Sequence, residues 1–581
     1  MSWRQLSMRK AAFAICAIVV LVVPIEKALT VGWEIKADIP QHVYGHGGAV
    51  VQDKLYSIGG CETADWTKTS TKVQVYDYAS DTWSKATDLP IELGWPMVAV
   101  HKDNIYVFGG MRSNAVSTSK AWRYNPANDK WKAITDLPVK AMNGIALTVG
   151  EGIYVGLGYQ RLDKTPRGVV ENFRNFYQYD PGKDSYKRLA DASEGACYAV
   201  PGAYEGNIYV VHGASYEVGF HDMNDYGWTD GVLCYNMQED SWRRIDIPRI
   251  RTRVFFLTQC TSSAVFGEKL FVCGGQSYHK RTTVASYFDM MRERFFGLPD
   301  LPKPRCCGGG GVAGGVVGNY IILSGGFWGV GETGDPASPT WVLNVEKLRE
   351  PGETITNSIG MKLAYIPAGQ FMMGSAVYDP THQYDEHQHP VRLSKPFFIA
   401  VTEVTQEQWH SVMGYNRSAH KGEDLPAEKL SWSEAVEFCQ RLEEKEGKKY
   451  RLPTDAEWEY ACRADDRWGS FSGTGRLDDM GFYDGNSDGT THRVGTKKAN
   501  SWGLYDMHGN VAEWCSDFYV ADYPTEDVID PVGPETGTAH VIRGGGWNSF
   551  APACRCAARS SAPASYQYPH TGFRVAMEVT E

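Results

Sequence analysis

The chain has 581 residues, 43% hydrophobic and 22% charged, which is typical of a globular protein but too long for a single core. Its formal charge of −11 gives no overall attraction to phosphate backbones, and this argues against nucleic-acid binding. The 61 glycines and the 12% aromatic content favour turn-rich β structure over a helical bundle.

The first 30 residues are typical of an export signal. Arg4, Arg9 and Lys10 precede an uncharged apolar run at 11–24, and polar sequence follows at once. The run is shorter than the ~20 residues that span a bilayer as a helix. We therefore predict a signal peptide at 1–30 and a secreted or periplasmic protein, in which disulfides can persist. A membrane association is expected only if the signal stays uncleaved.

A sequence pattern recurs six times between residues 33 and 345. Each copy has an apolar strand ending in glycines and then an aromatic-rich strand ending in Asp or Asn, and most copies add a Trp and a Leu-Pro pair. The first copy comprises residues 56–60, 75–77, Trp83 and 89–90. Paired glycines permit close approach of backbones, and a Trp can fill the wedge between neighbouring sheets. The pattern and its period of about 50 residues resemble kelch repeats, which implies a six-bladed β-propeller over 31–350.

The ends of this repeat region predict how the ring closes. The sixth copy lacks its own Trp and Leu-Pro, whereas Trp33, Ile39 and Pro40 precede the first double glycine. We expect the N-terminal strand to complete the last blade, because this hides an open sheet edge. Insertions at 161–174 and 216–228 are aromatic and charged. They are either a binding rim or merely tolerated loops.

After residue 351 the repeat ends and helix-forming residues become common. Three capping boxes predict helix starts, at Thr405 with Gln408, Ser431 with Glu434, and Thr454 with Glu457. The intervening sequence is typical of strands and loops. We therefore predict a second, α+β domain at 355–581.

Ordered motifs in this second region carry a family resemblance. The motifs are Gly360-Met361, Ile366 to Gly369, Phe371 to Gly374, Glu403 to Thr405, Arg451 to Thr454, Glu457 to Ala461, Gly503 to Met507, Gly509 to Val511, Glu513-Trp514, Arg543 to Gly545 and Gly572 to Arg574. Their order resembles that of formylglycine-generating enzymes, also called sulfatase-modifying factors. The resemblance implies a C-type-lectin-like α+β domain. Because that family includes non-catalytic members, the fold alone does not give the function.

The resemblance implies a copper- and oxygen-dependent oxidase that converts a cysteine of its substrate to formylglycine. Its two catalytic cysteines correspond here to Ser549 and Cys554. Cu(I) is a soft ion that two thiolates can hold, whereas a neutral hydroxyl is a poor ligand for it. We therefore expect no copper site, and Cys554 is a doubtful catalytic residue.

Other features implied by the resemblance are a calcium ion and a disulfide. The calcium ligands correspond to Asp506, Gly509, Val511 and Glu513, through carboxylates and backbone carbonyls. The alternative is that the carboxylates only accept bonds from loop N–H groups. The expected disulfide joins Cys462 to Cys556, or to Cys554 by a small shift in register. Cys439 has no cysteine at its family partner position, near Val575, and is expected to be a buried thiol.

A histidine cluster invites a metal assignment that its spacing does not support. His382, His387 and His389 lie beside Asp385 and Glu386 but match no compact ligand motif. A solvated loop is the expectation here.

Three functions are compatible with the sequence. The first is an exported recognition protein that binds a glycan or a protein through both domains, without oxidase activity. The second is an oxidase that modifies exported sulfatases while the propeller docks the substrate, and the third is an enzyme with other chemistry and no cofactor named by the sequence. We favour the first and place its binding groove at Trp547, Asn548, Ser549, Cys554 and Arg559. Arg559 and Arg574 are alternatively structural ion-pair partners.

Overall fold

The computed structural model describes most of the chain. It covers residues 32–579 except 44, 64–67, 114–115, 162–169, 212–230, 247–263, 274–275, 278–279, 282–284, 300, 302–312, 326–338, 378–380, 465–468 and 523–527. The predicted signal at 1–30 and most of the two predicted rim insertions lie outside these residues. Within the described ranges, no helix is both long enough and apolar enough to cross a membrane.

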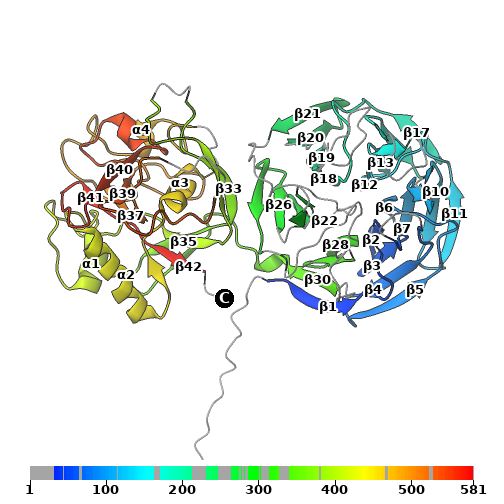
Figure 1. The fold of residues 1–581 in the computed structure, drawn as a ribbon, viewed down its shortest axis with the longest axis horizontal. Helices are drawn as coiled ribbons and strands as arrows, with labels where there is room; N and C mark the ends of the chain where they lie inside the picture. Colours follow the sequence, from blue (N-terminus) through cyan, green and yellow to red (C-terminus); the bar gives the residue numbers. More distant parts are fainter. Residues whose placement is uncertain are drawn as a thin grey trace, which may run out of the picture. The chain divides into compact units, whose positions relative to one another are not determined.

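The N-terminal region forms six four-stranded antiparallel sheets, arranged as blades around a central axis (Figure 1). Hydrophobic clusters fill the space between successive blades. The prediction of six blades is therefore confirmed. In blade order the strands are β2 (Gly47–Val51), β3 (Lys54–Ile58), β4 (Val73–Asp77) and β5 (Thr82–Ala86); β6 (Met97–His101), β7 (Asn104–Phe108), β10 (Ala121–Asn125) and β11 (Lys130–Ile134); β12 (Ile145–Val149), β13 (Gly152–Gly156), β16 (Phe176–Asp180) and β17 (Ser185–Arg188); β18 (Val200–Tyr204), β19 (Asn207–Val211), β20 (Gly231–Asn236) and β21 (Ser241–Asp246); β22 (Ala264–Phe266), β23 (Lys269–Cys273), β26 (Ala285–Asp289) and β27 (Arg294–Gly297); β28 (Ala313–Val317), β29 (Tyr320–Ser324) and β30 (Pro339–Asn344).

The ring is closed by the N-terminal strand β1 (Glu34–Asp38), which completes the sixth blade. It pairs antiparallel with β30, and Figure 1 shows the two strands side by side. The expected closure is therefore confirmed. Short hairpins project from three of the blades: β8 (Met111–Arg112) with β9 (Val116–Ser117), β14 (Tyr159–Arg161) with β15 (Val170–Asn172), and β24 (Gln276–Ser277) with β25 (Lys280–Arg281).

The recurring tryptophans join neighbouring blades at their outer edge. Trp83, Trp131 and Trp242 lie on outermost strands and are half-buried, and each packs against a hydrophobic cluster between two successive blades, as the sequence pattern predicted. Each ring packs on a tyrosine of the adjacent strand, with ring centroids 4.9–5.2 Å apart. Each indole N–H donates to a backbone carbonyl of the preceding blade at 2.9–3.2 Å.

An aspartate beside each of these rings makes a second tie between blades. Asp129 Oδ1 accepts the Tyr124 hydroxyl at 2.5 Å and the Thr87 N–H of the preceding blade at 2.8 Å. Its φ of +54° places it in the left-handed region, which Asp tolerates. The same pair of hydrogen bonds recurs at Asp81, Asp184 and Asp240.

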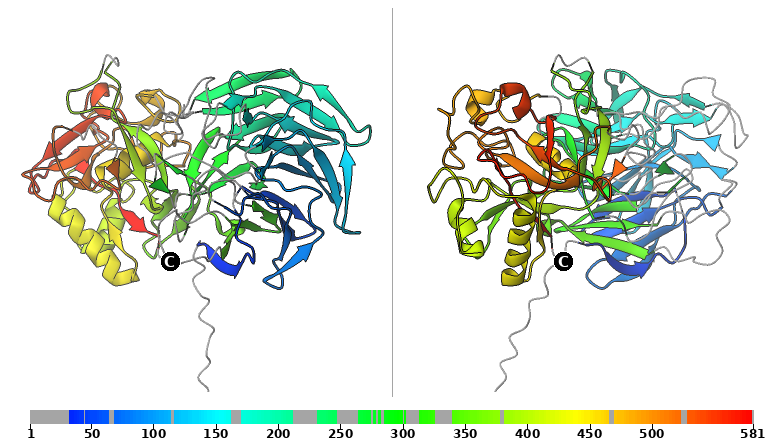
Figure 2. Two further views of the ribbon diagram at one scale, coloured as in Figure 1. Left: turned by 45° about the vertical axis from the view of Figure 1, so that its right-hand side comes forward. Right: turned by 60° about the vertical axis from the view of Figure 1, so that its left-hand side comes forward.

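The C-terminal region is an α+β domain with three small sheets, as expected. Helices α1 and α2 lie side by side along one flank, in yellow in Figure 2, and pack on the five-stranded sheet β31-β32-β35-β42-β36. The other sheets are β33-β34-β38 and β40-β39-β37-β41. The elements are β31 (Thr354–Thr356), β32 (Lys362–Ile366), β33 (Gly369–Met373), β34 (His389–Leu393), β35 (Phe397–Ala400), α1 (Gln406–Met413), α2 (Trp432–Glu446), β36 (Tyr450–Arg451), α3 (Asp455–Arg463), α4 (Leu477–Met480), β37 (Ala512–Phe518), β38 (Val528–Ile529), β39 (His540–Arg543), β40 (Arg559–Ala562), β41 (Thr571–Gly572) and β42 (Ala576–Glu578).

The three long helices begin where the capping boxes predict. Thr405, Ser431 and Thr454 each accept the N–H of the residue three positions on, and that residue's side chain accepts the cap N–H in return. Gly414 and Gly447 end α1 and α2 in the left-handed conformation.

Candidate functional site

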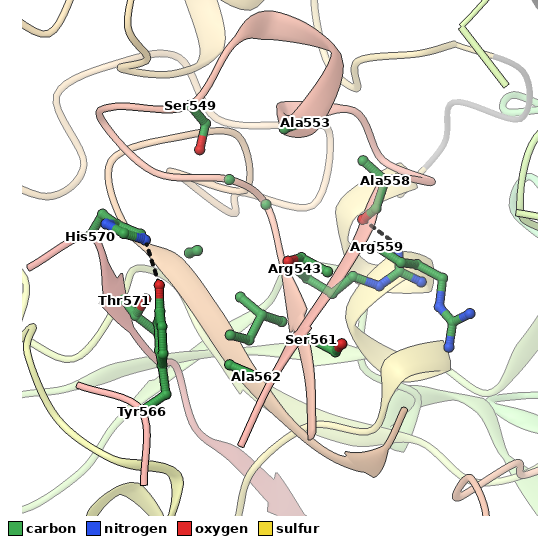
Figure 3. A pocket seen from close by; sticks show the side chains of 15 residues that line it. Arg543, Ser549, Ala553, Ala558, Arg559, Ser561, Ala562, Tyr566, His570 and Thr571 are labelled. Carbon is green, nitrogen blue, oxygen red and sulfur yellow. Dashed lines mark hydrogen bonds between the residues drawn. The ribbon is translucent and has the colours of Figure 1, made fainter. Parts of the chain in front are cut away.

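A pocket lies on the four-stranded sheet β40-β39-β37-β41 of the C-terminal domain, beside its edge strand β40 (Figure 3). Its volume is about 180 Å³. Strands β39 and β40, the segment that follows β39 and the segment before β41 all contribute to it. The lining residues are Ala512, Ile542, Arg543, Gly544, Gly545, Ser549, Ala553, Ala558, Arg559, Ser560, Ser561, Ala562, Tyr566, His570 and Thr571.

Hydroxyl groups and one imidazole dominate the polar wall of the pocket. His570 Nε2 lies 3.3 Å from the Tyr566 hydroxyl (Figure 3). The Nδ1 atom of His570 lies 3.3 Å from the Asn548 amide nitrogen. Burial lowers the pKa of His570, which favours a neutral ring. Thr571 Oγ1 is buried and has no hydrogen-bond partner among the described residues. This wall offers uncharged donors and acceptors to a ligand.

The two arginines that line the pocket direct their charge elsewhere. Arg543 is buried, and its guanidinium pairs with Asp455 at 2.5 Å and Glu459 at 2.9 Å. Arg559 pairs with Asp455 at 3.1 Å, and Figure 3 shows its guanidinium turned away from Ser549 and His570. The arrangement agrees with the ion-pair alternative for Arg559. The pocket therefore has no free charge from these two side chains.

The two positions predicted to correspond to the family's catalytic cysteines differ in chemistry and in exposure. Ser549 lines the pocket, and its Oγ accepts the Gly546 N–H at 2.9 Å. Cys554 is fully buried behind Gly545, since a Cβ added to that glycine would come within 2.7 Å of its sulfur. Burial raises the pKa of Cys554 to about 12, so its thiol is neutral at pH 7.

Two other predicted groove residues do not line the pocket. Trp547 donates its indole N–H to the Pro569 carbonyl at 2.9 Å and packs on His420. Asn548 is exposed, and its amide nitrogen lies near the ring of the lining residue His570. Sequence reasoning missed Ser560, Ser561, Tyr566, His570 and Thr571. The hydroxyl-rich run after Arg559 and the aromatic run at 566–570 were the available signals.

The predicted calcium segment contains both engaged and unengaged oxygen atoms. Asp506 is buried, and its Oδ2 accepts the Gly495 N–H at 2.6 Å, while Oδ1 has no hydrogen-bond partner among the described residues. Both Glu513 oxygens accept bonds from Arg574, at 2.6 and 2.7 Å, and Oε2 also accepts the Trp458 indole N–H. Arg574 is therefore a structural ion-pair partner.

The backbone of this segment turns sharply. Gly509 has φ +82°, and a Cβ there would lie 2.0 Å from the Phe482 carbonyl oxygen, so only glycine fits. The Val511 N–H donates to Glu403 Oε1 at 3.4 Å. Gly509 and Val511, whose carbonyls are the predicted backbone ligands, thus lie on a tight loop between the buried residues Asp506 and Glu513.

The cysteines predicted to form a disulfide lie together with a histidine. Cys462, Cys556 and His508 are fully buried, and their sulfur and nitrogen atoms lie within 4.8 Å of one another. Both cysteines are free thiols in the structure, so the bridge between them stays a prediction. His508 Nδ1 lies 2.7 Å from the Cys554 carbonyl, and its Nε2 accepts the Ser472 N–H at 3.1 Å. Cys439 is a buried free thiol, as expected.

The acidic residues of the histidine loop are buried. Glu386 forms a two-point ion pair with Arg555 at 2.7 and 2.9 Å, and Asp385 accepts the Tyr519 hydroxyl at 2.7 Å. His382 contacts Ser375, and His389 is buried. The expectation of a solvated loop is therefore wrong for Asp385, Glu386 and His389, whereas His382 is half-buried and His387 is exposed.

Comparison with known proteins identifies both halves of the chain. Residues 352–579 match the model of the sulfatase-modifying factor enzyme 1-like domain, and residues 33–284 match that of the attractin/LZTR1 beta-propeller. The chaperone protein LppX of Paenibacillus barcinonensis is 31% identical, over 31% of this chain and 79% of that protein. The formylglycine-generating enzyme of Mus musculus is 29% identical, over 39% of this chain, which spans only 62% of that enzyme's length.

Two solved structures are also similar. Treponema denticola variable protein 1 is 30% identical, with a TM-score of 0.36, over 39% of this chain and 99% of that one. PvdO from Pseudomonas aeruginosa is 28% identical, with a TM-score of 0.37, over 40% of this chain and 100% of that one. The chain belongs to the sulfatase-modifying factor family through residues 352–579, and it joins this domain to a kelch-type β-propeller.

Proposed function

We propose that this protein is a recognition protein of the secreted or periplasmic space, and that its C-terminal domain binds a glycan or an exported protein without oxidase activity. The observation that carries the proposal is the chemistry of the side chains at positions 549 and 554. A hydroxyl replaces one of the two thiols, and the remaining thiol is buried and neutral. The export signal expected at 1–30 supports the location.

The residues present do not fit copper. A Cu(I) site of the family type needs two thiolates, and disulfide-exchange chemistry also needs a pair of sulfurs. Ser549 supplies no sulfur, and its Oγ is engaged by the Gly546 N–H. A Cys554 thiol with a pKa of about 12 carries almost no thiolate at neutral pH. We therefore route no reaction step through copper.

The pocket supports a neutral, polar ligand. Its wall combines hydroxyls with a neutral His570, and its arginines are engaged by Asp455 and Glu459. The Tyr566 ring adds an apolar face beside these polar groups. Sugars and peptide backbones present matching donors and acceptors without charge, and ligand pockets are typically built from such mixtures.

A second candidate function keeps the oxidase. It is favoured by the curated relatives, since enzymes named formylglycine-generating enzyme are 29–37% identical to this chain. Under it, the propeller would dock exported sulfatases and Cys554 would act without a thiol at position 549. The burial of Cys554 weighs against this function.

We also propose that the domain holds one calcium ion through Asp506 and the adjacent backbone carbonyls of Gly509 and Val511. The fit rests on Asp506 Oδ1, a buried carboxylate oxygen that receives no donor from the described residues. When bound, the ion would supply positive charge to a buried acidic loop.

Binding to arrays of glycans and of exported proteins tests the recognition function. For any ligand found, T571V should weaken binding at least fivefold, because it removes a buried hydroxyl of the pocket that has no partner within the described protein. Since that hydroxyl bonds to no described group, the variant should fold normally. The control S411A, on the exposed face of α1, should bind like the wild type. Binding unaffected by T571V would place the ligand elsewhere.

A further inference from the structure

Three side chains that can bind a metal ion meet in the interior of the C-terminal domain. Cys462 lies near the end of α3, His508 in the loop before β37, and Cys556 shortly before β40. All three are 0% exposed, and their two sulfur atoms and one imidazole nitrogen lie within 4.8 Å of one another. Thiolate sulfur and imidazole nitrogen are the ligand atoms that zinc prefers in proteins.

The protonation of His508 suits a metal ligand. Its Nδ1 lies 2.7 Å from the Cys554 carbonyl oxygen, which can only accept, so Nδ1 carries the proton. Nε2 is therefore the unprotonated nitrogen, and it accepts the Ser472 N–H at 3.1 Å. A metal ion at Nε2 would replace this bond. The second nitrogen of a metal-binding histidine is typically held in the same way, by a backbone carbonyl.

The distances between the ligand atoms are close to those around zinc. His508 Nε2 lies 3.9 Å from Cys462 Sγ. In a tetrahedral zinc site, bonds of about 2.0 Å to nitrogen and about 2.3 Å to sulfur separate these two atoms by about 3.6 Å. Ser472 is also fully buried, and its Oγ lies 2.9 Å from Nε2, where it can fill the fourth position.

The charges of such a site also balance. Zinc binding displaces the proton of each thiol, and the two thiolates neutralise the doubly charged ion. A neutral centre suits a fully buried place, because an uncompensated charge there is costly.

We propose that Cys462, His508 and Cys556, together with the Ser472 hydroxyl, form a structural zinc site. The ion would join α3 to two segments distant in sequence, and the second of these segments continues directly from the pocket residue Ala553. The zinc ion and the disulfide implied by the family resemblance exclude each other, because they use the same two sulfurs. The inference is independent of the pocket ligand and of the calcium ion.

The zinc content of the full-length mature protein tests this site. The protein is produced in zinc-supplemented medium, purified without reductant or chelator, and analysed by inductively coupled plasma mass spectrometry. The wild type should hold about one zinc ion per chain. H508N keeps both sulfurs and an N–H for the Cys554 carbonyl but removes the Nε2 ligand. It should bind zinc about 100-fold more weakly, as measured by competition with a chromophoric chelator.

H540N is the matched control. His540 is also buried, and its Nδ1 lies 3.2 Å from a backbone carbonyl, that of Ser516. Its ring stacks on Trp432 and Phe518, away from the three proposed ligands. H540N should therefore bind zinc within about twofold of the wild type.

A measurement on the wild type alone keeps the test decisive if H508N does not fold. Replacement of zinc by cobalt(II) should produce a thiolate-to-metal charge-transfer absorption and the strong visible bands of a tetrahedral site. A wild type without zinc would overturn the proposal, and mass spectrometry of unreduced peptides would then show whether a disulfide joins Cys462 to Cys556. Wild-type zinc affinity in H508N would overturn it as well.

Discussion

Buried carboxyl groups decide much of the chemistry of the C-terminal domain, and Asp517 shows how. Its Oδ2 accepts the Asp455 N–H at 3.0 Å and the Ser516 hydroxyl at 2.9 Å. Burial, and then the charge of Asp455, nevertheless raise its pKa to about 7. Asp455 itself is held by Arg543 and Arg559, so the guanidinium charges are already committed.

A pH-dependent stability follows from Asp517. Because its pKa in the folded state is above the value of about 3.9 for an unfolded Asp, the folded state binds the extra proton between these values. This group's contribution to the free energy of unfolding therefore decreases as pH rises from about 4 to 7. D517N removes the titration, so its Tm relative to the wild type should rise by several degrees between pH 5 and pH 8. Calorimetry of both proteins, with the exposed-site variant E407Q as control, measures this. A pH-independent difference would contradict the assignment.

Single residues also mark the limit of sequence reasoning about the site. Ser549 was located from motif order alone, and the structure places it in the pocket wall. The burial of Cys554 behind Gly545 depends on how the segment folds, which motif spacing does not encode. His570 and Thr571 follow the end of β40 by eight and nine residues, and their return to the pocket wall depends on how the intervening segment folds.

At the scale of elements, sequence patterns predicted the features that depend on contacts between residues close together in the chain. The capping boxes fix the starts of α1, α2 and α3 through hydrogen bonds between residues three apart. The blade ties, in contrast, join residues more than 40 positions apart, such as Thr87 and Asp129. Sequence reasoning therefore predicted the packing of the tryptophans between blades but not the hydrogen bonds that tie the blades together.

The blade ties make a quantitative prediction. D129A removes the acceptor of two hydrogen bonds, and it also places Ala at φ +54°. D53A carries a similar backbone cost, at φ +60° in an exposed turn, and serves as the control. We expect D129A to lower the free energy of unfolding by about 2 kcal/mol more than D53A does, in urea denaturation. D129N keeps an acceptor oxygen and should fall between. Equal effects of D129A and D53A would show that the tie adds nothing.

At the scale of the whole molecule, the repeat pattern predicted the architecture because each copy of the pattern forms the same kind of four-stranded sheet. Six copies fixed the number of blades, and the incomplete last copy indicated closure by β1. Removal of residues 32–40 together with residues 1–31 should expose the edge of strand β30. We expect this variant to have a lower Tm and to associate in a concentration-dependent manner. Size-exclusion chromatography and thermal unfolding, compared with a variant lacking only residues 1–31, measure this. A monomer of unchanged Tm would show that closure is dispensable.

The absence of oxidase activity is the central claim, and one measurement tests it directly. A Cys-x-Pro-x-Arg peptide, the family's substrate motif, is incubated with the purified, copper-loaded protein and oxygen, and its mass is followed beside an active formylglycine-generating enzyme. We predict that the peptide cysteine remains unchanged, because Ser549 supplies no thiolate and the Cys554 thiol is buried and neutral. Conversion to formylglycine would contradict this account and show that Cys554 acts without a second thiol at position 549.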